Sequence, residues 1–478
     1  MVALITNFYK DLFHSHAGSR YDELLEKVHP KVSSDMNAAL QREVSDEEIK
    51  SALDCMGALK APGMDGMPVL FYKHFWDIVG ADATREVKNL LGGGAMAEGW
   101  NDTIMVVLIL KVPNLDRLKD LRPISLCNVV YKIASKVLSN CLKLILPDII
   151  SLNQSAFVPG RMITDNVLLA YELSHFMQTK KGSGDSFAAV KLDMSKAYDR
   201  VEWCFLEKMM RKLGFHEQWV SSIMKRVTTV RYHIKVNGCL TEDIVPERGL
   251  RQGDPLPPYL FLLCAEAFSC LLHDAEESGD LVGVKVSQEA PSINHLLFAD
   301  DSLLLLKTDD RSANQLQQIL SLYEDGSGQI INKDKSSVMF SKNAKMADKQ
   351  QLMHALEIRA EARKEKYLGL PVYMGRSNEK TIAYLKDKVW KRIQGWKEKL
   401  LLKAGKEILI KAVAQAIPSY AMSCFDLTKS LCDDLSTMIC RFWYNRSMKI
   451  KCIGCQRRSY AQVKRIVGSG LEICTSLI

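Results

Sequence analysis

Hydrophobic and polar residues recur with two different periods along this chain. Residues from about 5 to 60 follow a helical period and predict amphipathic helices, with Ser45 and Glu48 spaced to form a capping box. The run IMVVLIL (104–110) is too short to span a bilayer and predicts a buried strand. Residues 131–150 return to helical spacing, and the helix is expected to stop at Pro147.

The middle of the chain predicts a sheet backed by helices. FAAVKL is a short apolar strand that ends at Asp193, and HLLFADDSLLLL (295–306) predicts two strands joined by a tight turn. Between them lie a helical pattern over 198–215 that stops at Gly214, a hairpin turning at Asn237–Gly238, and an apolar helix opened by two prolines. This order fits an α+β class with a split βαβ, ferredoxin-like sheet.

The C-terminal part, from YLGLPV (367–372) onward, becomes helical and basic. Trp390 and Trp396 lie among lysines and arginines there, which predicts a small helical domain with a cationic face. The 478 residues, 47% of them hydrophobic, are enough for about two to four domains. The net charge of +8 suits a polyanionic partner without requiring one.

The cysteines and the first residues point to an intracellular protein. The thirteen cysteines are scattered singly, which predicts reduced thiols, and the start of the chain carries no signal-peptide pattern. Cys452 and Cys455 form one C-x-x-C pair, but no second pair follows to complete a zinc site.

Three carboxylates carry the candidate chemistry. Asp300 and Asp301 occupy the turn of HLLFADDSLLLL, where a pair of aspartates alone is most often an ordinary polar turn. Asp193 changes this interpretation, because it ends another strand of the same predicted sheet. If the two strands are neighbours, these carboxylates repel one another unless a cation lies between them. Hard divalent ions are the natural partners, Mg²⁺ first, and two such ions can clamp a phosphoryl transfer.

Eight motifs in order resemble a known family. KAPGMDG, LRPISLCNVVYKIASKVL and NQSAFVPGRMITDN are followed by KLDMSKAYDRVEW, GLRQGDPLPPYLF, LLFADDSLLLL, SGQIINKDKSSVMFS and YLGLPV. Together they resemble the reverse transcriptase of a plant LINE-type (non-LTR) retrotransposon, over nearly all of the chain to about residue 445. The resemblance implies a right-hand polymerase that copies an RNA template from a DNA primer, using dNTPs and two Mg²⁺ ions, with Mn²⁺ as an alternative. Residues 1–55 would be a helical connector, 56–183 the fingers, 184–345 the palm and 346–445 the helical thumb.

The resemblance also implies roles for individual residues. Asp193 and Asp300 would bind the two metals, with Asp301 as a weaker third carboxylate. The ring of Tyr198 would lie beneath the sugar of the incoming nucleotide and collide with a 2′-hydroxyl. Without the resemblance, a core aromatic at a helix start is the favoured interpretation of Tyr198.

Five further residues complete the implied site. Gln252 and Gly253 would lie against nucleotide and template, although neighbouring Arg251 and Asp254 fit a local ion pair that holds the loop. Lys111 and Arg122 match basic positions that meet the triphosphate, and otherwise fit ordinary surface cations. The resemblance assigns Lys335 the protonation of the pyrophosphate leaving group, with Lys333 only two residues away.

Three departures from the family bear on activity. Pro257 replaces a small hydroxyl residue beside the template loop, so a backbone donor and a hydroxyl are lost. The expected upstream endonuclease is missing, and residues 446–478 leave the family pattern, which favours a frameshifted or mis-spliced, poorly ordered tail.

A catalytically dead relic that still binds nucleic acid remains the alternative, while an intron maturase and a three-carboxylate nuclease fit the motifs less well. Such elements act on chromosomes, so a nuclear location is expected.

Overall fold

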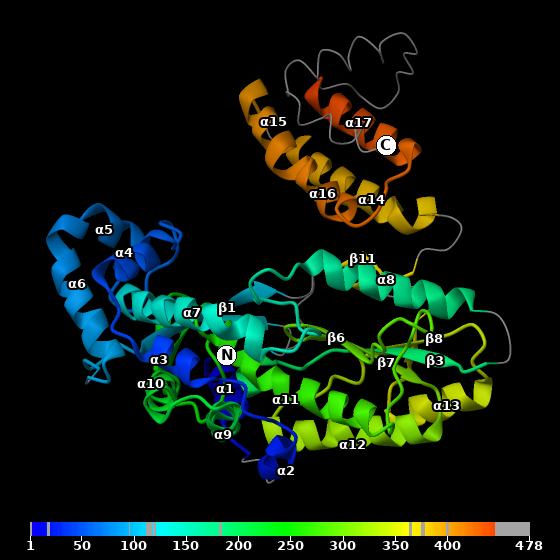
Figure 1. The fold of residues 1–478 in the computed structure, drawn as a ribbon. Helices are drawn as coiled ribbons and strands as arrows, with labels where there is room; N and C mark the ends of the chain where they lie inside the picture. Colours follow the sequence, from blue (N-terminus) through cyan, green and yellow to red (C-terminus); the bar gives the residue numbers. More distant parts are fainter. Residues whose placement is uncertain are drawn as a thin grey trace. The chain divides into compact units, whose positions relative to one another are not determined.

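The computed structural model describes residues 2–16, 20–94, 96–110, 118, 121–180, 184–362, 366–373, 378–397 and 401–444 (Figure 1). Lys111, Cys452, Cys455 and the predicted divergent tail lie outside the described residues. The chain forms two compact units, one of residues 1–163 and 177–362 and the other of residues 164–176 and 363–478. Within the described part of the chain, no helix is both long and apolar enough to cross a membrane.

Helices open the first unit, as the sequence predicts. They are α1 (Val2–Phe13), α2 (Tyr21–Glu26), α3 (Ser34–Gln41), α4 (Asp46–Asp54), α5 (Val69–His74) and α6 (Trp76–Leu91). The capping box at α4 is confirmed, because Ser45 Oγ accepts from the Glu48 N–H at 3.3 Å and Glu48 Oε2 accepts from the Ser45 N–H at 3.0 Å.

The long helix α7 (Val129–Ile149) packs against α4 and α6, and it runs past the proline that was expected to end it. The predicted stop at Pro147 is wrong by two residues. A proline this late removes one backbone bond, while burial of Leu146 and Ile149 and the bond from the Ile150 N–H to the Leu146 carbonyl hold the last turn.

A four-stranded sheet has the order β2-β1-β4-β5. It contains β1 (Asp102–Leu110), β2 (Leu121–Leu126), β4 (Arg231–Val236) and β5 (Cys239–Ile244), so the predicted strand 104–110 is confirmed. The predicted hairpin is also confirmed, since Asn237 and Gly238 both take positive φ, +48° and +89°, between β4 and β5. Residues of α1 pack into the core beneath this sheet.

A five-stranded sheet has the order β6-β7-β3-β8-β9 and positions the candidate site. Its strands are β3 (Phe187–Leu192), β6 (His295–Phe298), β7 (Asp301–Lys307), β8 (Ser337–Phe340) and β9 (Ala360–Glu361). Figure 1 shows α11 (Pro257–Glu277) and α12 (Asp310–Ser327) along one face of β3 and β7, and these elements share the largest buried core with α9 (Trp203–Leu213). α10 (Glu217–Thr228) and α13 (Met346–Ala355) complete this unit. The mixture of helices and mixed sheets agrees with the predicted α+β class.

The helical pattern predicted over 198–215 is only partly correct. The structure has one 3-10 turn, η2 (Tyr198–Arg200), before α9 begins at Trp203 and ends at Gly214 with φ +96°. The backbone between η2 and α9 forms hydrogen bonds with distant segments instead. The Glu202 N–H donates to the Ser327 carbonyl, and the Val201 carbonyl accepts from the Gly249 N–H. These bonds replace the helical ones that the spacing suggested.

The second unit is mainly helical, as predicted. It contains most of α8 (Ile163–Thr179), the short strands β10 (Lys366–Tyr367) and β11 (Leu370–Pro371), and α14 (Asn378–Lys397), α15 (Lys403–Leu409), η3 (Ile410–Ala414), α16 (Ala416–Met422) and α17 (Lys429–Trp443). Trp390 and Trp396 pack against its buried core, so their rings support the helices rather than lie fully exposed among the cations.

Candidate active site

The predicted neighbours β3 and β7 do pair directly. Their antiparallel register runs from Phe187–Lys307 to Leu192–Ser302, so Asp193 follows the end of β3 where Asp301 begins β7. Asp300 lies in the turn that joins β6 to β7, after Ala299. The apolar strands therefore bring all three predicted carboxylates to one edge of the sheet.

The carboxylates interact electrostatically at this edge. Burial raises the pKa of the Asp301 carboxyl above its usual range, the charge of Asp300 raises it further, and Asp193 adds to the effect while Lys191 opposes it. Among the described residues, no three His, Cys, Asp or Glu side chains already stand together as a metal site. The donors nevertheless fit divalent ions by type, because they are oxygen ligands whose mutual repulsion a hard cation relieves.

The loop before β8 fixes the backbone of Asp193. Its N–H donates to Ser336 Oγ at 3.1 Å, and its carbonyl accepts from the Asn332 N–H at 2.8 Å. Lys335 lies in the same loop with an exposed side chain. The ammonium of Lys333, the other lysine of this loop, forms an ion pair with Glu357.

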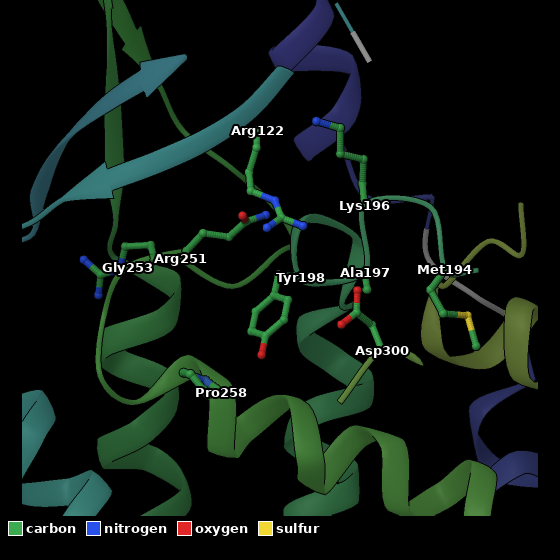
Figure 2. Close-up of a pocket in the computed structure, with 10 residues that line it drawn as sticks. Arg122, Met194, Lys196, Ala197, Tyr198, Arg251, Gly253, Pro258 and Asp300 are labelled. Atoms are coloured by element: carbon green, nitrogen blue, oxygen red, sulfur yellow. The ribbon is translucent and has the colours of Figure 1, made fainter. Parts of the chain in front are cut away.

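A cavity of about 270 Å³ opens beside the carboxylate edge (Figure 2). Five predicted site residues line it: Arg122, Tyr198, Gln252, Gly253 and Asp300. The remaining lining residues, four of them unforeseen, are Met194, Lys196, Ala197, Arg251 and Pro258. Three predicted residues stand outside this lining, namely Asp193, Asp301 and Lys335.

Arg122 and Lys196 line the same cavity as the Asp300 carboxylate. Figure 2 shows Arg122, from β2, above the ring of Tyr198, with Asp300 beside the ring and Pro258 below it. Lys196 adds a second cation, and its ammonium donates to the carbonyl of Leu121, next to Arg122. Lys196 has φ +57°, a left-handed conformation that the sequence did not reveal.

Tyr198 is fixed from two sides. Its ring stacks on Phe261 of α11 with centroids 4.8 Å apart and planes 16° apart, and its carbonyl accepts from the Leu250 N–H at 2.7 Å. Burial raises the pKa of its hydroxyl, as does the charge of Asp300, while Arg122 opposes both. The neutral ring therefore forms a rigid wall of the cavity.

The loop Gly249–Asp254 is held against β2 and η2. The Ser125 N–H donates to the Gln252 carbonyl at 2.8 Å, and Gln252 Nε2 donates to Asp199 Oδ1 at 3.1 Å. Gly253 has φ +108°, and a Cβ there would lie 2.9 Å from the Ser125 carbonyl oxygen. The loop thus needs glycine at this position for close backbone approach.

Arg251 forms the local ion pair considered from the sequence. Its guanidinium lies 3.3 Å from Asp254 Oδ2, and both side chains are almost fully buried. It also donates to Asn101 Oδ1 at 2.5 Å and to the Tyr131 hydroxyl. Arg251 therefore ties the loop to β1 and α7.

Pro257 begins α11 and is buried. It lines a separate cavity of about 10 Å³ behind the loop, with Tyr131 and Tyr232, whereas Pro258 lines the larger one. The departure from the family pattern therefore lies behind the loop that borders the larger cavity.

His295 is a buried residue of β6 and does not line the cavity that holds Asp300. Asn294 Nδ2 donates to the Leu272 carbonyl, so Asn294 Oδ1 accepts from His295 Nδ1, and His295 Nε2 accepts from the Ser269 hydroxyl at 2.6 Å. Burial lowers the pKa of His295 from 6.5 to about 3. The imidazole is neutral in the folded protein at neutral pH.

The lowered pKa of His295 is expected to make the free energy of unfolding depend on pH in the acidic range. Because the unfolded chain binds a proton below pH 6.5 and the folded chain does not, stability falls as pH drops from 6.5 toward 3. The component amounts to at most about 1.4 kcal/mol per pH unit. In urea unfolding across this range, His295→Gln should flatten the pH dependence, and exposed His74→Gln should not. An unchanged slope in His295→Gln would show that another group dominates.

Comparison with known proteins now identifies the family. Residues 109–372 match the family described as reverse transcriptase (RNA-dependent DNA polymerase). The chain belongs to this family. The match includes Asp193, Asp300 and most of the cavity-lining loops.

Several relatives carry the names of transposable elements. The chain is 30% identical over 430 residues to the Transposon TX1 uncharacterized 149 kDa protein of Xenopus laevis, covering 88% of this chain and 32% of that protein. It is 27% identical over 273 residues to a retrovirus-related Pol polyprotein from the type-1 retrotransposable element R2 of Popillia japonica, covering 56% of this chain and 35% of that protein. The chain is therefore a reverse transcriptase domain of the non-LTR retrotransposon kind, and it spans about a third of the length of these relatives.

Proposed function

We propose that this chain catalyses RNA-directed DNA synthesis, joining a dNTP to the 3′-hydroxyl of a DNA primer on an RNA template. The observation that carries the proposal is the cavity beside the β3–β7 edge, which is lined by Asp300, Tyr198 and cations that include Arg122 and Lys196, in a chain of the reverse transcriptase family. A carboxylate side for metal and a cationic side for phosphate are the two requirements of nucleotidyl transfer.

Asp193, Asp300 and Asp301 would hold two divalent ions, Mg²⁺ or alternatively Mn²⁺. When bound, such ions polarise the phosphoryl group and neutralise developing charge. Arg122 and Lys196 would bind the triphosphate oxygens, Arg122 through its planar fork and Lys196 as a point charge. Both cations border the cavity, which supports this role.

The remaining roles rest on position. Lys335 would donate a proton to the departing pyrophosphate, supported by its place on the loop that holds the backbone of Asp193. Gln252 and Gly253 would lie against nucleotide and template, and Lys111 would add a further cation. In this arrangement residues 56–183 act as fingers, 184–345 as palm and 346–445 as thumb.

Primer extension tests the proposal directly. Purified protein, a DNA primer annealed to RNA, Mg²⁺ and dNTPs should give template-directed incorporation. Protein that binds the primer–template but extends nothing would instead support the alternative of a catalytically inactive relic.

We expect the Tyr198 ring to select deoxyribose over ribose in the incoming nucleotide. Tyr198→Val should remove the bulk that meets a 2′-hydroxyl, so discrimination between dNTP and rNTP should fall about tenfold or more, as expected for a lost steric contact of this size. The measurement is kcat/KM for dCTP and for CTP in single-nucleotide extension. Tyr198→Phe keeps the ring and should retain discrimination. If the Val variant discriminates as well as the natural chain, the ring does not select the sugar.

We also propose that the chain derives from a plant LINE-type element and acts in the nucleus. Its support is the ordered motif set and a stretch of 67 residues that is 57% identical to an uncharacterized mitochondrial protein of Arabidopsis thaliana, covering 14% of this chain and 55% of that protein. The nuclear location is proposed because such elements act on chromosomes.

A further inference from the structure

The turn that carries Asp300 has an unusual backbone. Ala299, directly before Asp300, has φ +54°, a left-handed conformation that a residue with a Cβ rarely adopts. Such a turn persists only where its surroundings hold it. The direction of Asp300 therefore depends on whatever fixes Ala299.

Gln154 makes that contact from a segment far away in the sequence. Its Oε1 accepts from the Ala299 N–H at 3.0 Å and from the Ala156 N–H at 3.0 Å. The side chain is 1% exposed, and its Nε2 has no hydrogen-bond partner among the described residues. A buried unpaired donor is unfavourable. The two contacts of the oxygen give a reason for a glutamine at this position.

The segment around Gln154 is itself anchored to β6. The Ser155 N–H donates to the Leu297 carbonyl at 3.1 Å, and the Leu297 N–H donates to the Asn153 carbonyl at 2.8 Å. Arg161 holds the same segment, because its guanidinium donates to the carbonyls of Pro147, Ile150, Ser151 and Gln154. Gln154 thus stands on a rigid support rather than on a loose loop.

We propose that Gln154 is a positioning residue that fixes the Ala299–Asp300 turn and thereby sets the direction of the Asp300 and Asp301 carboxylates. The proposal rests on the proposed function for its catalytic consequence. Its structural part, that the Gln154 carbonyl oxygen holds the Ala299 N–H, stands independently of catalysis.

Three variants test the proposal. Gln154→Leu removes the acceptor, Gln154→Glu keeps one, and Gln178→Met is the control, because Gln178 donates to the Phe340 carbonyl on β8 instead. Hydrogen exchange of the peptide spanning 296–303 reads the Ala299 bond. We expect faster exchange in the Leu variant and slow exchange in the Glu variant and the control.

Kinetics read the catalytic consequence. In the Leu variant, kcat should fall up to about a hundredfold through misplacement of the reacting groups, while KM for dNTP changes little. Unchanged exchange in the Leu variant, or exchange raised equally in the Leu and Glu variants, would overturn the proposed clamp, which is the hydrogen bond from the Ala299 N–H to Gln154 Oε1. Faster exchange with a normal kcat would overturn the positioning role. If the Leu variant does not fold, slow exchange in the Glu variant supports the clamp and fast exchange overturns it. A natural chain that extends no primer would refute the proposed function, whereas the exchange comparison would still decide the clamp.

Discussion

Asp300→Asn is expected to abolish primer extension, with kcat lowered by about a thousandfold, the scale seen when one charge-stabilising group is lost from an active site. Asp300 is the carboxylate that both lines the cavity and stands beside Tyr198. Replacing it with an amide removes one negative charge from the set that would hold the divalent ions, with almost no change in shape. The measurement is single-nucleotide incorporation on an RNA template across a range of Mg²⁺ concentrations.

The control for this substitution is Asp243→Asn on β5, an exposed carboxylate away from the cavity lining. It should leave incorporation unchanged. Folding should survive in both variants, because Asp300 adds repulsion to Asp301 rather than a stabilising pair. Incorporation at the natural rate by Asp300→Asn would place the chemistry somewhere other than this cavity.

Much of the carboxylate edge was predictable because strand patterns place residues by simple rules. A strand ending at Asp193 and a hairpin carrying Asp300 fix where both carboxylates stand once the strands pair, and they do pair. Arg122, Tyr198 and Gly253 also reach the same cavity, as the resemblance implied. Local periodicity and ordered motifs carry this kind of information.

The supporting residues were not predictable, because their partners are distant in sequence. Nothing in NQSAFVPGR indicates that Gln154 meets Ala299, 145 residues later. Lys196 sits in the motif of Asp193 and Tyr198, where a cation was a visible signal, but its direction depends on a left-handed backbone. At Pro147 the sequence contains a local stop signal that the structure does not follow, since burial of the last turn of α7 overrides it.

Arg251→Met is expected to destabilise the protein by about 3–5 kcal/mol, the usual cost of breaking a buried ion pair. The Arg251 side chain is 4% exposed, and its guanidinium has Asp254, Asn101 and Tyr131 as partners. Methionine fills part of the space but leaves the Asp254 carboxylate buried without its cation. Urea unfolding gives the change in the free energy of unfolding. Arg211→Met, which removes exposed ion pairs with Glu207 and Glu217, should change it by less than about 1 kcal/mol.

A double substitution separates stability from placement. Replacing Asp254 with Leu in the Arg251→Met chain removes both buried charges, so part of the lost stability should return. Incorporation should not return with it, because the loop would no longer be tied to Asn101 and Tyr131, and Gln252 and Gly253 would lose their fixed position at the cavity wall. Recovery of both stability and incorporation would mean that Arg251 acts only on stability. Recovery of stability alone would mean that the buried pair is retained because it places the loop.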